Sequence, residues 1–134
     1  MNKMKILILL LSLASLPACQ IISPIFVDYN GVRRDVAQWI NHHQLLSMQQ
    51  KRALVQLSKA QQKINRFAEY DQSKQWTITQ KNQIALYCAG RSVSEHKIQQ
   101  LQEKIHGDET AMILQRYEQL APKIKLDLNA VQCE

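Results

Sequence analysis

The chain has 134 residues, which is room for one domain, and only three of them are glycine and three proline. Such a low content of helix-breaking residues favours helices over a sheet-based fold. The net charge of +6 at pH 7 comes from basic residues spread along the chain, which argues against a nucleic-acid-binding tract and favours a solvated surface.

Residues 1–18 have the composition of a cleavable signal peptide. Lys3 and Lys5 give a positive start, residues 6–13 are almost entirely Leu and Ile, and Ala18 precedes the expected cut. The apolar stretch is short for a bilayer, because a spanning helix needs about 20 apolar residues. Loss of this segment removes two lysines and no acid, and the mature net charge of +4 suits anionic lipid headgroups or an acidic partner.

The segment closes with Leu16-Pro17-Ala18-Cys19, which resembles the lipobox of bacterial lipoproteins. In that family the cysteine at the cut receives a diacylglycerol thioether and then an N-acyl chain such as palmitate. The resemblance implies that Cys19 is the lipid attachment site. It also implies the outer membrane, facing the periplasm, because Gln20 at the sorting position is not Asp. The alternative is an ordinary signal peptide cut after Ala18, with Cys19 a plain thiol.

Residues 19–30 are expected to form the acylated N-terminus and a short tether. Ser23-Pro24 interrupts helix formation, and Asn30-Gly31 is a strong turn signal. The helical domain is therefore expected over residues 31–134.

From Val32 onward, apolar residues recur at spacings of three and four, which predicts a small all-α bundle of four or five amphipathic helices. The first stripe runs from Val32 to Leu46. Ser47 and Gln50 then form a capping-box pattern that opens a second helix, expected to reach about Tyr70.

Residues 71–73 are interpreted as a break, and a third helix is expected to begin near Thr77 or Thr79. Gly90 fits its C-cap, where a left-handed backbone is wanted. Ser92 and Glu95 form a second capping-box pattern for a fourth helix, which is expected to stop at Gly107.

Asp108 is expected to cap a fifth helix, because Asp is a preferred N-cap residue. Its apolar period continues past Pro122 to Ile124, Leu128 and Val131, which predicts a kink or a new helix beginning at the proline. The alternation of Ile124, Leu126 and Leu128 leaves a short strand as the alternative.

Cys88 and Cys133 remain as an even pair once Cys19 is assigned to the lipid. An exported chain meets an oxidising compartment, so the two are expected to form a disulfide. The alternatives are two unpaired thiols or a metal site shared with a histidine.

Catalytic patterns are weak. His42 and His43 are adjacent and point about 100° apart on a helix, whereas helical metal pairs are spaced three or four residues apart. His96 and His106 have no partner at ligand spacing. We expect no enzyme activity, no cofactor and no metal site, with His43 half-buried and the other histidines on the surface.

The two tryptophans are interpreted differently. Trp39 lies on the first apolar stripe and is expected in the core. Trp76 follows the predicted break and, with Tyr70 and Lys74 near it in sequence, is a candidate anchor at an interaction surface. The alternative is that the Trp76 ring covers the end of the core.

Leu46-Ser47-Met48-Gln49-Gln50 resembles the Leu-Thr-x-x-Gln signature of small periplasmic helical stress chaperones, with Ser in place of Thr. Residues 76–80 match it in part and lack the leading Leu. Members of that family are all-helical dimers that hold unfolded clients on a basic concave face. The resemblance implies a homodimer and an unfolded-protein binder as an alternative function.

The favoured function is a non-enzymatic envelope lipoprotein, an accessory or interaction subunit held at the membrane through lipid on Cys19. Its expected partner is another envelope protein, and no nucleic acid is expected because an exported chain rarely meets any. Besides the chaperone alternative, a small inhibitor of a cell-wall hydrolase remains open, since small disulfide-closed exported proteins suit that role.

Overall fold

The structure is a computed structural model that describes residues 31–134, and the predicted signal peptide, Cys19 and the tether lie outside this range. The described residues form helices and no strand, so the predicted all-α bundle is confirmed. The elements are α1 (Arg34–His42), α2 (Met48–Gln61), the 3-10 helix η1 (Ile64–Glu69), α3 (Gln72–Gly90), α4 (Glu95–His106), the 3-10 turn η2 (Gly107–Glu109) and α5 (Thr110–Leu120).

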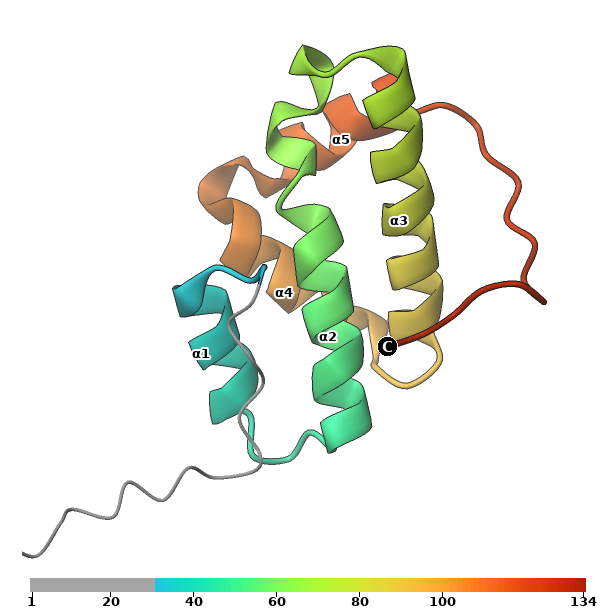
Figure 1. Cartoon of the computed structure of the whole chain (residues 1–134). Coiled ribbons are helices and arrows are strands. Elements are labelled where there is room, and N and C mark those ends of the chain that lie inside the picture. Colours follow the sequence, from blue (N-terminus) through green and yellow to red (C-terminus); the bar gives the residue numbers. More distant parts are fainter. Residues whose placement is uncertain (1–30) are drawn as a thin grey trace, which may run out of the picture.

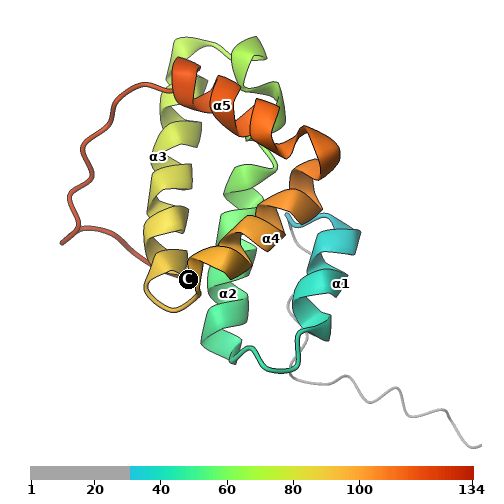
Figure 2. The same cartoon turned by 180° about the vertical axis from the view of Figure 1, so that it is seen from behind.

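Helix α2 is the centre of the bundle, because α1, α3 and α4 all pack against it. α2 and α3 run antiparallel side by side, and α1 lies on the other side of α2 (Figure 1). α4 crosses the back of this layer, and α5 lies across the end of the bundle where η1 joins α2 to α3 (Figure 2).

The main core is formed by apolar side chains from α1 to α4, as the helical stripes predict. Its fully buried members include Ile40 of α1, Leu54 and Leu57 of α2, and Leu101 of α4. The buried residues that α3 contributes to this core are Ala85 and Ala89. Small residues at these positions let the α3 backbone approach α2 closely, since no large side chain separates the two helices.

A second, smaller core joins α5 to η1 and the start of α3. It consists of Ile64, Phe67, Ile78 and Tyr117. The rings of Phe67 and Tyr117 meet edge to face, with centroids 5.0 Å apart and an interplanar angle of 83°. Tyr117 is the one buried residue of α5, so this aromatic pair is the main attachment of that helix.

The predicted capping box at the start of α2 is confirmed. The Ser47 hydroxyl accepts a hydrogen bond from the Gln50 backbone N–H, and the Gln50 side chain accepts one from the Ser47 N–H. The Gln50 amide also donates to the Ser92 carbonyl at 2.8 Å, which ties the start of α2 to the α3–α4 loop.

Helix α3 begins earlier than predicted and ends differently. Asp71, interpreted as part of a break, is its N-cap and accepts a hydrogen bond from the Lys74 backbone N–H. Gly90 is the last helical residue rather than a left-handed C-cap, and Arg91 after it keeps a right-handed helical conformation. The second helix is likewise shorter than predicted, because the chain passes from α2 into η1 after Gln61.

Three predictions for the last third of the chain are wrong. The N-cap of α4 is Ser94, not Ser92, with its hydroxyl accepting from the Lys97 backbone N–H at 3.2 Å. Asp108 lies inside η2 and does not cap α5. Residues 121–134 form neither a helix nor a strand. Gly107 does end α4, as predicted, and its φ is positive.

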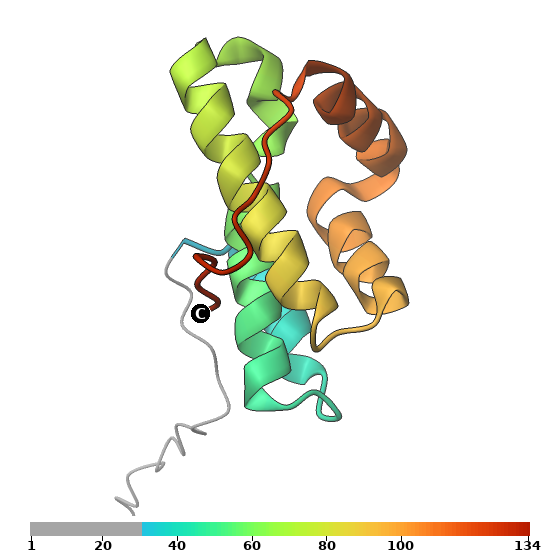
Figure 3. The ribbon, with the colours of Figure 1, turned by 90° about the vertical axis from the view of Figure 1, so that its right-hand side faces the viewer.

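This irregular C-terminal segment runs back along the side of the bundle formed by α2 and α3 (Figure 3). It has little regular hydrogen bonding of its own and most of its residues are exposed. Its position therefore depends on the attachments at its end, which lie at the candidate site.

Candidate functional site

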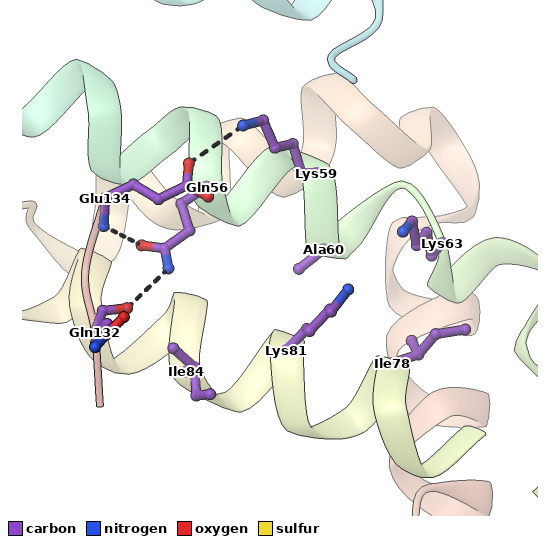
Figure 4. A pocket seen from close by; sticks show the side chains of 9 residues that line it. All are labelled: Gln56, Lys59, Ala60, Lys63, Ile78, Lys81, Ile84, Gln132 and Glu134. Carbon is purple, nitrogen blue, oxygen red and sulfur yellow. Dashed lines mark hydrogen bonds and ion pairs between the residues drawn. The ribbon is translucent and has the colours of Figure 1, made fainter. Parts of the chain in front are cut away.

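A pocket of about 330 Å³ opens between α2, α3 and the end of the C-terminal segment. Three lysines, Lys59, Lys63 and Lys81, stand on its wall, and we call it the lysine pocket (Figure 4). Its remaining lining residues are Gln56, Ala60, Ile78, Ile84, Gln132 and Glu134. The volume lies at the lower end of the range for small-molecule sites, about 300–1,000 Å³.

The wall of the lysine pocket carries an excess of positive charge. Lys59 pairs with the Glu134 carboxylate, with Nζ and Oε2 3.2 Å apart. No salt bridge joins Lys63 or Lys81 to a carboxylate of residues 31–134. The lining thus contains three ammonium groups and one side-chain carboxylate, which favours an anion electrostatically.

One wall of the pocket is held by a covalent bond. Cys88 of α3 and Cys133 form a disulfide with their Cα atoms 5.5 Å apart, which confirms the predicted pairing and excludes the thiol and metal alternatives. Gln132 and Glu134, which line the pocket, flank Cys133 directly. The disulfide therefore holds these two residues beside α3 at the edge of the pocket.

The Gln56 side chain adds a second attachment for the same segment. Its amide nitrogen donates to the Gln132 carbonyl, and its amide oxygen accepts from the Glu134 N–H, each at 3.4 Å. The side-chain amide of Gln56 thus pairs with a backbone C=O and a backbone N–H, as a peptide group of a neighbouring strand would. The two bonds position Glu134 next to α2, and its carboxylate there forms the ion pair with Lys59 (Figure 4).

Of the predicted interaction surface of Tyr70, Lys74 and Trp76, the structure brings Tyr70 and Lys74 together. The Lys74 ammonium lies 4.1 Å from the centroid of the Tyr70 ring, a cation–π contact. Trp76 is 46% exposed and belongs to neither core cluster. Residues two apart on a helix point roughly 200° apart, so Trp76 faces a different side of α3 from Lys74.

Trp39 packs against the main core, as predicted. Its ring lies beside that of His43, with centroids 4.2 Å apart, and the His43 Nδ1 lies 2.6 Å from the Trp39 carbonyl oxygen. His43 is half-buried, which also agrees with the prediction.

His106 is not on the surface, which corrects the prediction for this residue. It is 8% exposed, with Nδ1 2.5 Å from Oδ1 of Asn65 and Nε2 3.1 Å from Oε1 of Gln61. Burial and the charge of Arg33 lower the pKa of His106 to about 4, so its imidazole is neutral at pH 7. A neutral imidazole has one N–H, so it donates to only one of these two amide oxygens.

Lys51 is the most deeply buried charged side chain of the bundle, at 1% exposed. Its amine donates to the Asn41 carbonyl oxygen at 3.1 Å, near the C-terminus of α1. The last carbonyls of a helix lack intrahelical partners and favour a positive charge. Lys51 therefore caps α1 from α2, a structural role away from the lysine pocket.

No three His, Cys, Asp or Glu side chains gather in residues 31–134 where they could hold a metal ion. None of the helices in that range is both long enough and apolar enough to cross a membrane.

Sequence reasoning missed the lysine pocket. Lys59 and Lys63 are four residues apart, a spacing that puts both on one face of the helix predicted to reach Tyr70, although Lys63 lies just beyond the end of α2. Lys81 joins them only because α3 folds back beside α2, and no local pattern predicts that pairing.

Comparisons of the chain with protein-family models, with curated proteins and with solved structures found no match.

Proposed function

We propose that the chain is an exported lipoprotein of the bacterial envelope, and that its helical domain is a non-enzymatic interaction subunit. The observation that carries the proposal is the Cys88–Cys133 disulfide. Structural disulfides persist in exported proteins and are rare in the reducing cytosol. The disulfide thus supports export independently of the signal-like residues 1–18 and of the lipobox at Cys19.

The interaction role rests on exposed apolar side chains. Trp76, Met112, Leu120 and Leu128 each keep about half of their surface in water, and Leu45 is fully exposed. Tryptophan is enriched among residues that dominate binding energy at protein interfaces. Trp76 is accordingly our first candidate contact with an envelope protein.

The anchor is tested by labelling cells with an alkyne analogue of palmitate. The wild-type chain is expected to take up label and to sediment with outer membranes, while Cys19→Ser takes up none. Gln20→Asp is expected to keep the label and to move towards the inner membrane. An unlabelled wild-type chain in the soluble periplasmic fraction would contradict the anchor and favour an ordinary signal peptide cut after Ala18.

The interaction role is tested with a photo-crosslinking amino acid at Trp76 and, as a matched control, at Gln99, which is exposed on α4. The expected result is one discrete adduct from position 76 and none from position 99. A broad set of unfolded envelope proteins captured from both positions would contradict a specific subunit and favour the chaperone alternative.

A further inference from the structure

The lysine pocket combines two surfaces of different chemistry. Its apolar part consists of the half-buried Ile84 and of the small exposed parts of Ala60 and Ile78, contributed by α2 and α3. The ammonium groups of the three lysines stand around this part (Figure 4). An inorganic anion would leave the apolar part in water, and a neutral apolar molecule would leave the ammonium groups without a counter-charge.

The charges in the pocket define what a ligand must bring. Glu134 supplies a counter-charge to Lys59, while Lys63 and Lys81 have none among residues 31–134. A carboxylate or phosphate between the latter two would gain charge-assisted hydrogen bonds. The Glu134 side chain, 54% exposed, lies at the same wall and competes for Lys59.

We propose that the lysine pocket binds a single-chain amphiphilic anion. Its carboxylate or phosphate group lies at the amines of Lys63 and Lys81, and its apolar chain lies on Ala60, Ile78 and Ile84. The site does not depend on the proposed function, because every residue it uses belongs to the described domain and none to the anchor.

Octanoate is a suitable probe, because it carries one carboxylate on a short apolar chain and stays monomeric at millimolar concentration. We would titrate it into the full-length ¹⁵N-labelled chain carrying Cys19→Ser, and follow the amide resonances by NMR. Saturable shifts are expected at Ala60, Lys81 and Ile84. Octyl phosphate is expected to bind at the same residues, which compares the two headgroups.

Two further probes separate the parts of the ligand. Octanol keeps the chain without the charge, and inorganic phosphate keeps the charge without the chain. Each is expected to bind at least about fivefold more weakly than octanoate, because each uses one of the two surfaces.

Charge variants test the assignment of the headgroup. Lys63→Ala and Lys81→Ala are each expected to weaken octanoate binding about fivefold, the effect of one partly exposed ion pair. Glu134→Gln is expected to strengthen it, because removing this carboxylate makes the pocket more positive. Lys123→Ala, at an exposed lysine outside the pocket, is the matched control and is expected to change nothing.

All these side chains are exposed or half-buried, so the variants are expected to fold, which circular dichroism checks. Shifts that do not saturate, or that lie away from α2 and α3, would overturn the proposal. So would equal affinity for octanol or for inorganic phosphate, or a Lys123→Ala loss as large as that of Lys81→Ala.

Discussion

Gly90 and Gly107 stand at the ends of consecutive helices and have different backbone conformations. Gly90 is helical, whereas Gly107 has a φ of +65°. A Cβ atom added at either position would meet no atom within 4 Å. Substitution by alanine at the two positions therefore compares backbone conformation alone.

Gly107→Ala is expected to lower the free energy of unfolding by about 1–3 kcal/mol, because its φ of +65° with a ψ of −143° is a backbone conformation almost restricted to glycine. Gly90→Ala is expected to raise it by about 0.5–1 kcal/mol, because alanine is the better helix former and its unfolded chain has less entropy. Urea unfolding followed by circular dichroism measures both. Changes of the same sign would contradict the assigned conformations.

His106 makes the stability depend on pH. Its pKa falls from 6.5 in the unfolded chain to about 4 in the folded one, so below pH 6.5 the unfolded state binds the proton first. The stabilising contribution is complete above pH 6.5 and is lost as the pH falls towards 4. At pH 5 the domain is expected to be about 2 kcal/mol less stable than at pH 8.

The matched variants are His106→Gln and His96→Gln, the second at an exposed position. Urea midpoints measured from pH 8 to pH 5 are expected to fall for the wild type and for His96→Gln. The fall is expected to be much smaller for His106→Gln. An equal fall in all three proteins would assign the pH dependence to other groups.

At the scale of the element, the sequence predicts the start of a helix well where a capping residue stands directly before a stretch of helically spaced apolar residues. Ser47 does so, and its box with Gln50 is found as predicted. The predicted Ser92 cap is wrong because Ser94, two residues on, has the extended conformation and makes the bond instead. Ser92 has Glu95 three residues on and fits the capping-box pattern, whereas Ser94 has Lys97 at that spacing. The fold of the α3–α4 loop, and not the pattern, therefore decides between them.

The capping box at α2 gives a prediction. Ser47→Ala is expected to lower the free energy of unfolding by about 1 kcal/mol, because the Gln50 N–H loses its acceptor. Ser73→Ala, at an exposed serine in the first turn of α3, is the control and is expected to change it little. Equal effects in urea unfolding would mean that the Ser47 bond contributes nothing specific.

At the scale of the whole molecule, the sequence indicates helices but not their arrangement. Apolar stripes predict which faces are buried, and Leu54, Leu57 and Leu101 are in the core accordingly. They do not predict that α5 crosses the bundle end on Tyr117, nor that the chain after Pro122 leaves helix. Its apolar period there is misleading, because most of these side chains stay at least partly exposed. The lysine pocket depends on the packing of α3 beside α2, so the sequence patterns could not predict it either.

The disulfide closes a loop over a sequence separation of 45 and includes α4 and α5. The chain-entropy model gives about 4 kcal/mol of stabilisation for a loop of this size. The Cys88→Ser, Cys133→Ser double variant is expected to lose up to that amount while keeping its helical circular dichroism, because both core clusters remain. An unchanged urea midpoint would contradict this, and reduced wild-type protein provides the comparison.

The two ends of the described domain meet at one side chain. Gly31 lies against the Lys59 side chain, with a Cβ there 3.6 Å from Lys59 Cγ, and Glu134 pairs with the Lys59 amine. Neighbouring ends make a fold tolerant of circular permutation. A chain that begins at α2, opened in the loop at the fully exposed Leu45 and joined from Glu134 to Gly31 by a short linker, is expected to build the same bundle. The order in which the helices are connected is thus separable from the packing that holds them.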